Sequence, residues 1–305
     1  METSNLILLI VISTIRMSIP MVLASSGAAF SMRAGVSDLG CEGMMISGSL
    51  LAVIVSYYTG SAWLGLLGGI LAGGVISMLH AVMHVTYRVN ATISGMCINL
   101  LGLAISPLIL QLIWQQRNSS SRVSAFSPIK IDALDKIPVL GNILNQQNVL
   151  FYLSVVFIII GYVFMFRTTK GLRMRMVGEN PQAASTVGIN VTGYKYFGVL
   201  MCGLLCGMGG AYLSIGQLDL FVDGMTAGRG YIAVVINAFG RYNPIGALLG
   251  SMFFGFFDSL QVIFQDSGVP NQVMRMIPYL FTLVVIAFGV RRSHTPAGVG
   301  KFHDS

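Results

Sequence analysis

Charged residues are scarce in this sequence of 305 residues. They make up 10% of the chain, whereas hydrophobic residues make up 54%, and the mean hydropathy is +0.77. A chain with so few polar groups cannot cover a globule that faces water on all sides, which excludes a soluble domain. The apolar residues instead gather in runs of about 20, the length of helix that crosses the core of a bilayer. The composition therefore predicts a membrane protein.

Several functional motifs are also missing. No Gly-x-x-x-x-Gly-Lys-[Ser/Thr] phosphate-binding loop occurs, and no group of residues resembles a catalytic constellation. The net charge of +7 comes without a basic patch interleaved with aromatic residues, so we expect no nucleic-acid binding. The four cysteines lack the spacing of a zinc site or a disulfide framework. Cys202 and Cys206 are expected to share one face of a membrane helix as packing residues.

The histidines give no stronger signal. His80 and His84 are four residues apart, a spacing that could suggest a pair of metal ligands. No carboxylate accompanies them at ligand spacing, so we expect residues at a helix end rather than a metal site.

Nine apolar runs are expected to be membrane helices. The seventh is short for a full crossing, so the expected number of helices is about nine, within a range of about 8 to 10. The predicted fold class is an all-α membrane protein, a polytopic bundle that forms one domain over residues 1–305. The runs cover residues 6–30, 36–57, 62–83, 91–114, 149–166, 195–217, 228–240, 244–264 and 273–290.

One segment of the sequence occurs twice. Residues 35–80 match residues 216–261 without a gap, with 12 identities in 46 positions, where chance would give roughly three to five. Each copy begins with a glycine, and acidic residues follow three and seven positions later. They are Asp38 and Glu42 in the first copy, and Asp219 and Asp223 in the second. Acidic residues and glycines at matching places in two apolar halves are typical of broken helices at a transport site.

The basic residues indicate the orientation. When residues 167–193 and the C-terminus are placed in the cytoplasm, 11 of the 18 Lys and Arg residues lie inside. The N-terminus and a long polar loop over about 115–148 then lie outside. The repeat halves, about 35–114 and 216–290, run in opposite directions through the membrane. The sequence thus predicts an internal inverted repeat, an arrangement that many transporters use to build one site near the midplane.

Residues 178–190 predict a short helix outside the membrane. Asn180 can cap its N-terminus, Pro181 suits the first helical position, and Gly188 supplies the left-handed residue past its end. Two turns of helix are unstable alone in water, so its flanking spans or a partner must hold it. The alternative is an ordinary capped connector.

Several motifs together resemble one family of membrane proteins. They are residues 33–45, 171–191, 209–214, 225–233 and 239–244. The segment 171–191 is similar to the cytoplasmic coupling segment of permeases of ATP-binding-cassette importers for branched-chain amino acids, simple sugars and nucleosides. The other motifs are similar to signatures of the sugar/nucleoside subgroup. The sequence departs from them at Asp38, where Asn is more usual, at Ser31-Met32, where an acidic residue is common, and at Ile236-Asn237.

The resemblance implies a permease subunit in the plasma membrane that is not itself an enzyme and binds no cofactor. ATP and Mg²⁺ would be held by a separate nucleotide-binding subunit, and a second permease, an extracellular solute-binding lipoprotein and membrane lipid would be the other partners. The implied substrate is a nucleoside or, less strongly, a simple sugar, with branched-chain amino acids last. The residues expected to couple to the ATPase are Gly178, Glu179, Asn180, Pro181, Gln182, Ala183, Ala184 and Gly188.

A second group of polar residues would lie along the translocation path or in the broken helices: Asp38, Glu42, Asn99, Asp219, Asp223, Arg229 and Asn237. Such residues at membrane depth line cavities or pair with one another. Asp219 and Asp223 would be solvated at the outer surface, or touch substrate. Asp38 and Glu42 would pair with Arg33, Arg229 or Arg16, or touch substrate.

The remaining alternatives concern the amides and the energy source. Asn99 and Asn237 would hydrogen-bond between helices, or to a ribose or base. A different class of function is also open, an ion-coupled secondary transporter that carries protons on the four repeated carboxylates.

Overall fold

The computed structural model describes residues 2–127, 145, 147–263, 276, 280 and 295–300. The regular elements of this part of the chain are helices, and an isolated bridge joins Ser119 to Val222 in its irregular segments. The elements in order are α1 (Glu2–Arg33), α2 (Cys41–Thr59), α3 (Ala62–Ala81) with the π-helical turn η1 (Val82–Thr86), α4 (Ala91–Trp114), α6 (Val149–Arg167), α7 (Thr169–Glu179), α8 (Pro181–Thr186), α9 (Val191–Ala211) with the π-helical turn η2 (Tyr212–Leu218), α10 (Arg229–Phe239) and α11 (Pro244–Ile263).

Seven segments of the described chain are long and apolar enough to cross a membrane. They are Leu6–Arg33, Cys41–Thr59, Ala62–Thr86, Ala91–Trp114, Val149–Arg167, Val191–Leu218 and Pro244–Ile263. The helix α10 is apolar but shorter, as predicted for residues 228–240. These elements confirm a polytopic helical membrane protein. The expected number of nine is not confirmed, since most of the run 273–290 lies outside the described residues, as does most of the predicted loop 115–148.

Local capping explains where several helices begin. The side chains of Asn90, Asn148 and Asn190 accept hydrogen bonds from backbone N–H groups in the first turns of α4, α6 and α9. These bonds satisfy donors that the helix itself leaves unpaired. At the other end of α2, Gly60 adopts φ +68° and its N–H donates to the Ser56 carbonyl, which ends the helix.

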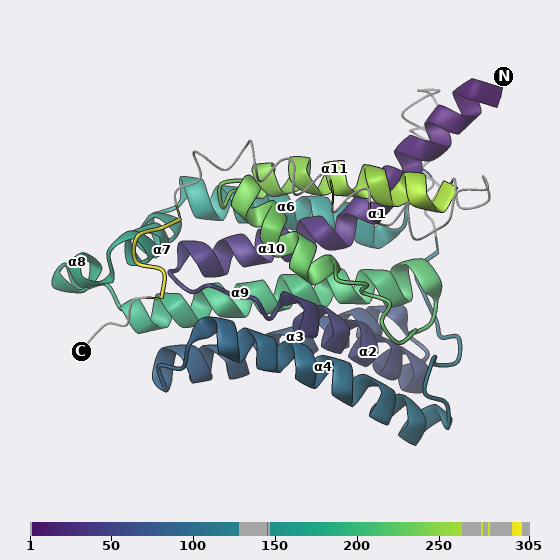
Figure 1. Cartoon of the computed structure of the whole chain (residues 1–305), viewed down its shortest axis with the longest axis horizontal. Coiled ribbons are helices and arrows are strands. Elements are labelled where there is room, and N and C mark those ends of the chain that lie inside the picture. Colours follow the sequence, from purple (N-terminus) through teal and green to yellow (C-terminus); the bar gives the residue numbers. More distant parts are fainter. Residues whose placement is uncertain are drawn as a thin grey trace.

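Glycines allow the helices at the centre of the bundle to pack closely. A side chain at Gly73 of α3 would collide with the carbonyl of Gly203 in α9, and one at Gly207 would collide with the carbonyl of Gly69. Backbones therefore meet directly along this interface, as is common where small residues line contacts between membrane helices. The helix α9 is the most buried of the candidate spans, and Figure 1 shows it running through the middle of the bundle.

The packing has the pattern that an inverted repeat predicts. The helix α3 packs on α9 as well as on its neighbour α2, and α11 packs mainly on α1. The matched segments pair the hairpin α2–α3 with α10–α11, and the same offset extended toward the N-terminus pairs α1 with α9, which makes these two contacts equivalent. Figure 1 shows α1 and α9 running in opposite directions along the bundle, and α2 and α10 both beginning near its middle. The bounds of the two repeat halves stay a prediction.

The two copies differ at the start of their helices. In the first copy, residues 34–40 leave α1 and α2 begins at Cys41, so the helix starts later than the predicted run 36–57. In the second copy, η2 continues to Leu218 and α10 begins only at Arg229. The second copy therefore has a longer non-helical stretch before its first helix. The two copies have corresponding helix ends again at the next turn, between α2 and α3 in the first copy and between α10 and α11 in the second.

Candidate functional site

The starts of α2 and α10 meet at the buried carboxylate of Glu42. Its Oε1 accepts hydrogen bonds from the Thr226 hydroxyl at 2.6 Å and from the Gly228 N–H at 3.0 Å, and its Oε2 accepts from the Gly230 N–H at 2.7 Å. The cap residue Gly228 has no side chain to satisfy the first N–H groups of α10. Glu42 supplies the missing acceptor and also places a negative charge at a helix N-terminus, where the helix dipole favours it.

Two glycines permit this junction. A Cβ on Gly230 would lie 2.5 Å from the backbone nitrogen and Cα of Glu42, so α10 can approach α2 this closely only with glycine there. Gly228 adopts φ +79°, a conformation that other residues rarely take. The sequence therefore fixes the contact on both sides, by a carboxylate in α2 and by glycines in α10.

Asn99 of α4 holds the break before α2. Its Oδ1 accepts from the Gly43 N–H at 2.8 Å, and its Nδ2 donates to the Leu39 carbonyl at 2.8 Å. One amide side chain thus bonds to the chain on both sides of the helix start. These bonds join α4 to the start of α2, and contact of Asn99 with a ribose or base stays a prediction.

Asp38 lies beside Asn99 in the same break, and it is buried. Its Oδ1 accepts from the Gly40 N–H at 2.9 Å and lies 3.8 Å from Nε2 of His80. The other ring nitrogen of His80 lies 2.9 Å from the Ser94 hydroxyl. Within the described part of the chain, Asp38 Oδ2 and His80 Nε2 have no hydrogen-bond partner. Sequence reasoning found no carboxylate for the histidines, because Asp38 comes from a distant segment.

Asp219 and Asp223 are exposed. Their solvation at the outer surface stays a prediction. Asp219 ends η2 with φ +59° and lines a cavity of about 400 Å³ together with Arg16 and Gln217. Asp223 accepts a hydrogen bond of 3.3 Å from the Ser106 hydroxyl. Both acidic residues of the second copy are therefore accessible, whereas both acidic residues of the first copy are buried.

Residues 118–126 hold this exposed segment in place. The Val123 N–H donates to the Asp219 carbonyl at 2.9 Å, and the Asp223 N–H donates to the Asn118 carbonyl at 2.9 Å. The Phe126 N–H donates to the carbonyl of Ile215 at 3.0 Å. The non-helical stretch of the second copy thus obtains its backbone hydrogen bonds from the start of the predicted outer loop.

The arginines have partners that the sequence did not predict. Arg229 forms an ion pair with Asp258 of α11 at 3.4 Å rather than with a carboxylate of the repeated motif. Both side chains border a cavity of about 460 Å³, which Asp223 also lines. Arg33 donates to the carbonyls of Arg241 and Tyr242, which ties the end of α1 to the turn before α11.

Asn237 lies on α10 and is buried. In the described residues, neither its carbonyl oxygen nor its amide nitrogen has a hydrogen-bond partner. It therefore differs from Asn99, whose amide is fully used.

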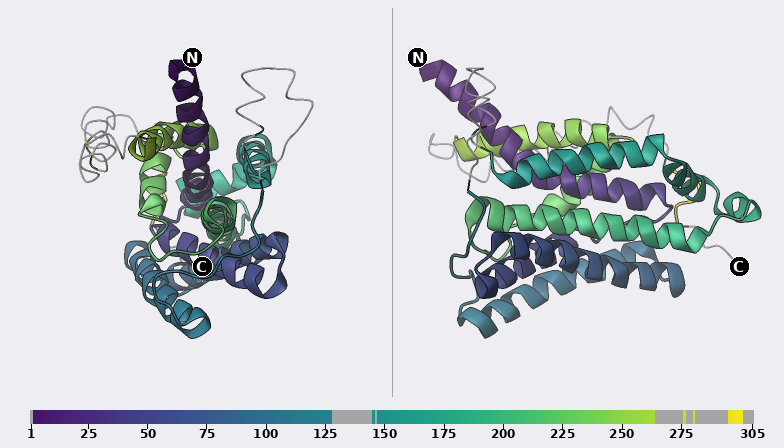
Figure 2. Two further views of the ribbon diagram at one scale, coloured as in Figure 1. Left: turned by 90° about the vertical axis from the view of Figure 1, so that its right-hand side faces the viewer. Right: turned by 180° about the vertical axis from the view of Figure 1, so that it is seen from behind.

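The predicted short helix is present as α8, and it lies at the end of the bundle beyond the membrane helices (Figures 1 and 2). The Asn180 side chain accepts from the Ala183 N–H at 3.1 Å, and Pro181 occupies the first turn. Gly188 follows the helix with φ +77°. Each of the three end signals has the role that the sequence predicted.

The helix α8 has a buried side and an exposed side. Ala184 packs in a small cluster with Val177 of α7 and Val191 of α9. Gln182 and Ala183 are exposed, and so is Val187, whose exposed fraction is 64%. Val187 is thus an apolar side chain left open just past the end of a helix that packs on one side.

The C-terminal residues 295–300 lie against the same end of the bundle. The Gly298 N–H donates to the Gly178 carbonyl at 2.9 Å, and the Ala297 N–H donates to Oε2 of Glu179 at 3.2 Å. A Cβ on Gly178 would collide with the Arg33 carbonyl. Gly178 and Glu179 therefore join α7 to α1 and to the C-terminal segment. These contacts hold the end of α7 from which α8 continues.

Comparison with known proteins identifies the family. Residues 10–287 match the family model described as branched-chain amino acid transport system / permease component. The chain is 36% identical to the guanosine ABC transporter permease protein NupQ of Bacillus subtilis and to the nucleoside ABC transporter permease protein NupC of Lactococcus lactis, in each case over 98% of both chains. It is 32% identical to the putative glucose ABC transporter permease protein TsgC13 of Haloferax volcanii, over 93% of this chain and 92% of that one.

No solved structure matches the chain. The family model covers most of the sequence, and the relatives just named cover nearly all of it. The chain therefore belongs to the branched-chain amino acid transport permease family, and it is a multi-pass permease subunit of an ATP-binding-cassette importer.

Proposed function

We propose that this permease imports a nucleoside, with a simple sugar as the second choice, and that α8 couples it to a separate ATPase. The named relatives support the substrate class, since two are nucleoside permeases at 36% identity and one is a putative glucose permease at 32%. The observation that carries the coupling role is α8 itself, a capped helix at the end of the bundle with an exposed apolar residue, Val187.

The end of the bundle that carries α8 would face the cytoplasm. It holds Arg33, Arg167 and the basic residues of α7, and basic residues collect on the cytoplasmic side of membrane proteins. The N-terminus would then lie outside and the C-terminus inside. Asp219 and the cavity beside it would lie at the outer surface, where an extracellular solute-binding lipoprotein delivers the substrate.

A displacement of α8 would be transmitted to the centre of the permease through the helices packed against it. Ala184 connects α8 to α7 and α9, and Gly178 connects α7 to the end of α1. From there α9 packs on α2 and α3, and α1 packs on α10 and α11. The two halves would rock about the junction at Glu42, which opens the path alternately to each side.

Within this scheme the polar residues divide into two groups. Asp38, Glu42 and Asn99 fix the geometry of the broken helices, because their polar atoms bond to backbone groups around the helix starts. Asp219, Asp223, Arg229 and Asn237 would contact the substrate, since they border cavities or retain unused polar atoms. The buried, hydrogen-bonded position of Glu42 argues against the ion-coupled alternative, in which this carboxylate would load and release protons.

The coupling role is tested by a matched pair of substitutions in α8. Ala183→Glu alters the exposed side, so we expect ATP hydrolysis to become uncoupled from substrate uptake while the permease stays folded. Ala184→Glu puts a charge into the cluster beneath α8, so we expect the helix to detach and the melting temperature to fall. Uptake and ATPase activity are measured on the complex in liposomes. Tight coupling in both variants would rule out a docking role for α8.

Substrate is tested in the same liposomes. Accumulation of radiolabelled guanosine with ATP inside, when the binding protein is present, is the expected result. Uptake that continues without any ATPase subunit would contradict the proposal.

A further inference from the structure

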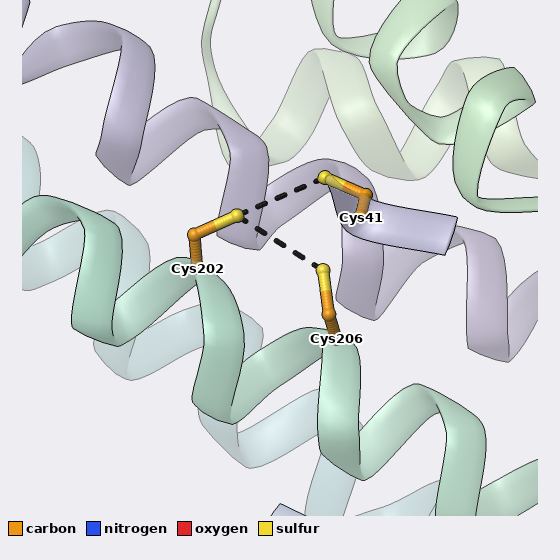
Figure 3. Close-up of side chains that lie close together, drawn as sticks. All are labelled: Cys41, Cys202 and Cys206. Atoms are coloured by element: carbon orange, nitrogen blue, oxygen red, sulfur yellow. Dashed lines mark hydrogen bonds between the residues drawn. The ribbon is translucent and has the colours of Figure 1, made fainter. Parts of the chain in front are cut away.

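Three buried cysteines converge where α2 begins. Cys41 is the first residue of α2, while Cys202 and Cys206 lie one turn apart on α9. The sulfurs of Cys41 and Cys202 are 3.8 Å apart, and those of Cys202 and Cys206 are 4.0 Å apart. All three sulfurs lie within 4.8 Å of one another, and Figure 3 shows them pointing toward a common centre between the two helices.

This spacing fits a single metal ion. Zinc binds thiolate sulfur at about 2.3 Å, so three sulfurs around one ion lie roughly 3.8 to 4.0 Å from each other in tetrahedral or trigonal geometry. The Cys41–Cys202 and Cys202–Cys206 separations match that range, and the third pair of sulfurs lies within 4.8 Å. Thiolates are the ligands that soft cations such as Zn²⁺ and Cu⁺ select.

Polar groups lie near the start of α2, and among them the Asp38 carbonyl contacts a cluster sulfur. The carbonyl of Asp38 lies 3.6 Å from the Cys41 sulfur, and the buried carboxylate oxygen Oδ2 of Asp38 has no partner in the described residues. The N-terminus of α2 adds a partial positive charge beside Cys41, which offsets the negative charge of bound thiolates.

We propose that Cys41, Cys202 and Cys206 form a binding site for one soft d¹⁰ cation, Zn²⁺ or Cu⁺. On binding, the three S–H bonds break, three sulfur–metal bonds form and three protons leave to solvent, so no oxidant or reductant is required. The ion would fasten the start of α2 to α9. If α2 moves against α9 in the transport proposed above, the bound ion would hold these two helices together and inhibit uptake.

The site is tested with Cd²⁺, which shares the ligand preference of Zn²⁺ and gives an ultraviolet charge-transfer band when thiolates bind it. The full chain in lipid nanodiscs is titrated with Cd²⁺. We expect a thiolate–cadmium band that saturates at one ion per chain. Cys202→Ser should weaken binding by about tenfold or more, since it removes the ligand that lies between the other two.

Cys97→Ser is the matched control, because Cys97 is exposed on α4 and lies outside the cluster. It should leave the band and the affinity unchanged. Cys206→Ala replaces Cys202→Ser if the latter does not elute as folded protein. The proposal is overturned if the wild type gives no thiolate–cadmium band, or if Cys97→Ser abolishes that band. It is also overturned if Cys202→Ser and Cys206→Ala both retain the band with the affinity of the wild type. The titration needs no transport, so its failure leaves the proposed import unaffected, and failed import leaves the cadmium result standing.

Discussion

Glu42 caps a helix that lies 188 residues further along the chain, since its Oε2 accepts from the Gly230 N–H at 2.7 Å. Its other oxygen serves Thr226 and Gly228 in the turn before the same helix. One carboxylate of the first repeat copy thus closes the N-terminus of the helix in the second copy. Glu42 therefore fixes the position of the start of α10 relative to the start of α2.

Glu42→Gln should destabilise the permease. A carboxamide has one acceptor oxygen instead of two and would turn its NH₂ group toward a backbone donor, which leaves a buried N–H unpaired. We expect the free energy of unfolding to fall by about 1–3 kcal/mol, measured as a lower melting temperature in detergent. Glu179→Gln is the control, because Glu179 is exposed and a carboxamide there can still accept from the Ala297 N–H. Equal stability of the two variants would show that the capping bonds contribute little.

Gly230→Ala tests the close approach of α10 to α2. The new Cβ would lie 2.5 Å from the backbone of Glu42, so α10 must move and the capping bonds must lengthen. We expect a loss of about 1–3 kcal/mol in stability, typical of overpacking. Gly161→Ala in α6 is a matched control, since its Cβ would meet only the ring of Phe30, at 3.3 Å. A smaller loss at Gly230 than at Gly161 would contradict the described contact.

Features with local causes could be predicted from the sequence. The run 91–114 became α4 with the same bounds, because a long apolar segment has no other way to satisfy its backbone in a membrane. The cap of α8 at Asn180 was also predicted, since capping depends on residues a few positions apart. The predicted start of α2 was several residues too early, because hydropathy does not register the break that Asn99 stabilises.

Features that depend on distant contacts could not be predicted. The bonds of Glu42 go mainly to backbone N–H groups, which every residue carries and no sequence pattern marks. The Asp258 carboxylate pairs with Arg229 only because α10 and α11 fold back on each other as a hairpin. The cysteine cluster could not be predicted from the spacing of cysteines in the sequence for the same reason, since Cys41 reaches it from another helix.

Asn99→Asp separates the two hydrogen bonds of Asn99. A carboxylate can still accept from the Gly43 N–H, but it cannot donate to the Leu39 carbonyl and instead places a negative charge against it. We expect stability to fall by about 1–3 kcal/mol, measured by thermal unfolding. Asn90→Asp is the control, because the Asn90 side chain only accepts, from the Thr92 N–H, and Asp caps a helix equally well. If Asn90→Asp proved the more harmful change, the donor role of Asn99 would be wrong.

Arg229 and Asp258 should be coupled energetically. Their side chains are 17% and 20% exposed, so water screens the ion pair only in part. Removing either charge by Arg229→Gln or Asp258→Asn leaves the other poorly compensated, and removing both relieves that penalty. A double-mutant cycle should therefore give a coupling energy of about 0.5–3 kcal/mol in thermal stability. Arg229→Gln combined with Glu179→Gln, which share no partner, should be additive. Additivity in the Arg229–Asp258 cycle as well would mean that the ion pair does not hold α10 to α11. The shape of the cavity that both side chains border would then depend on packing alone.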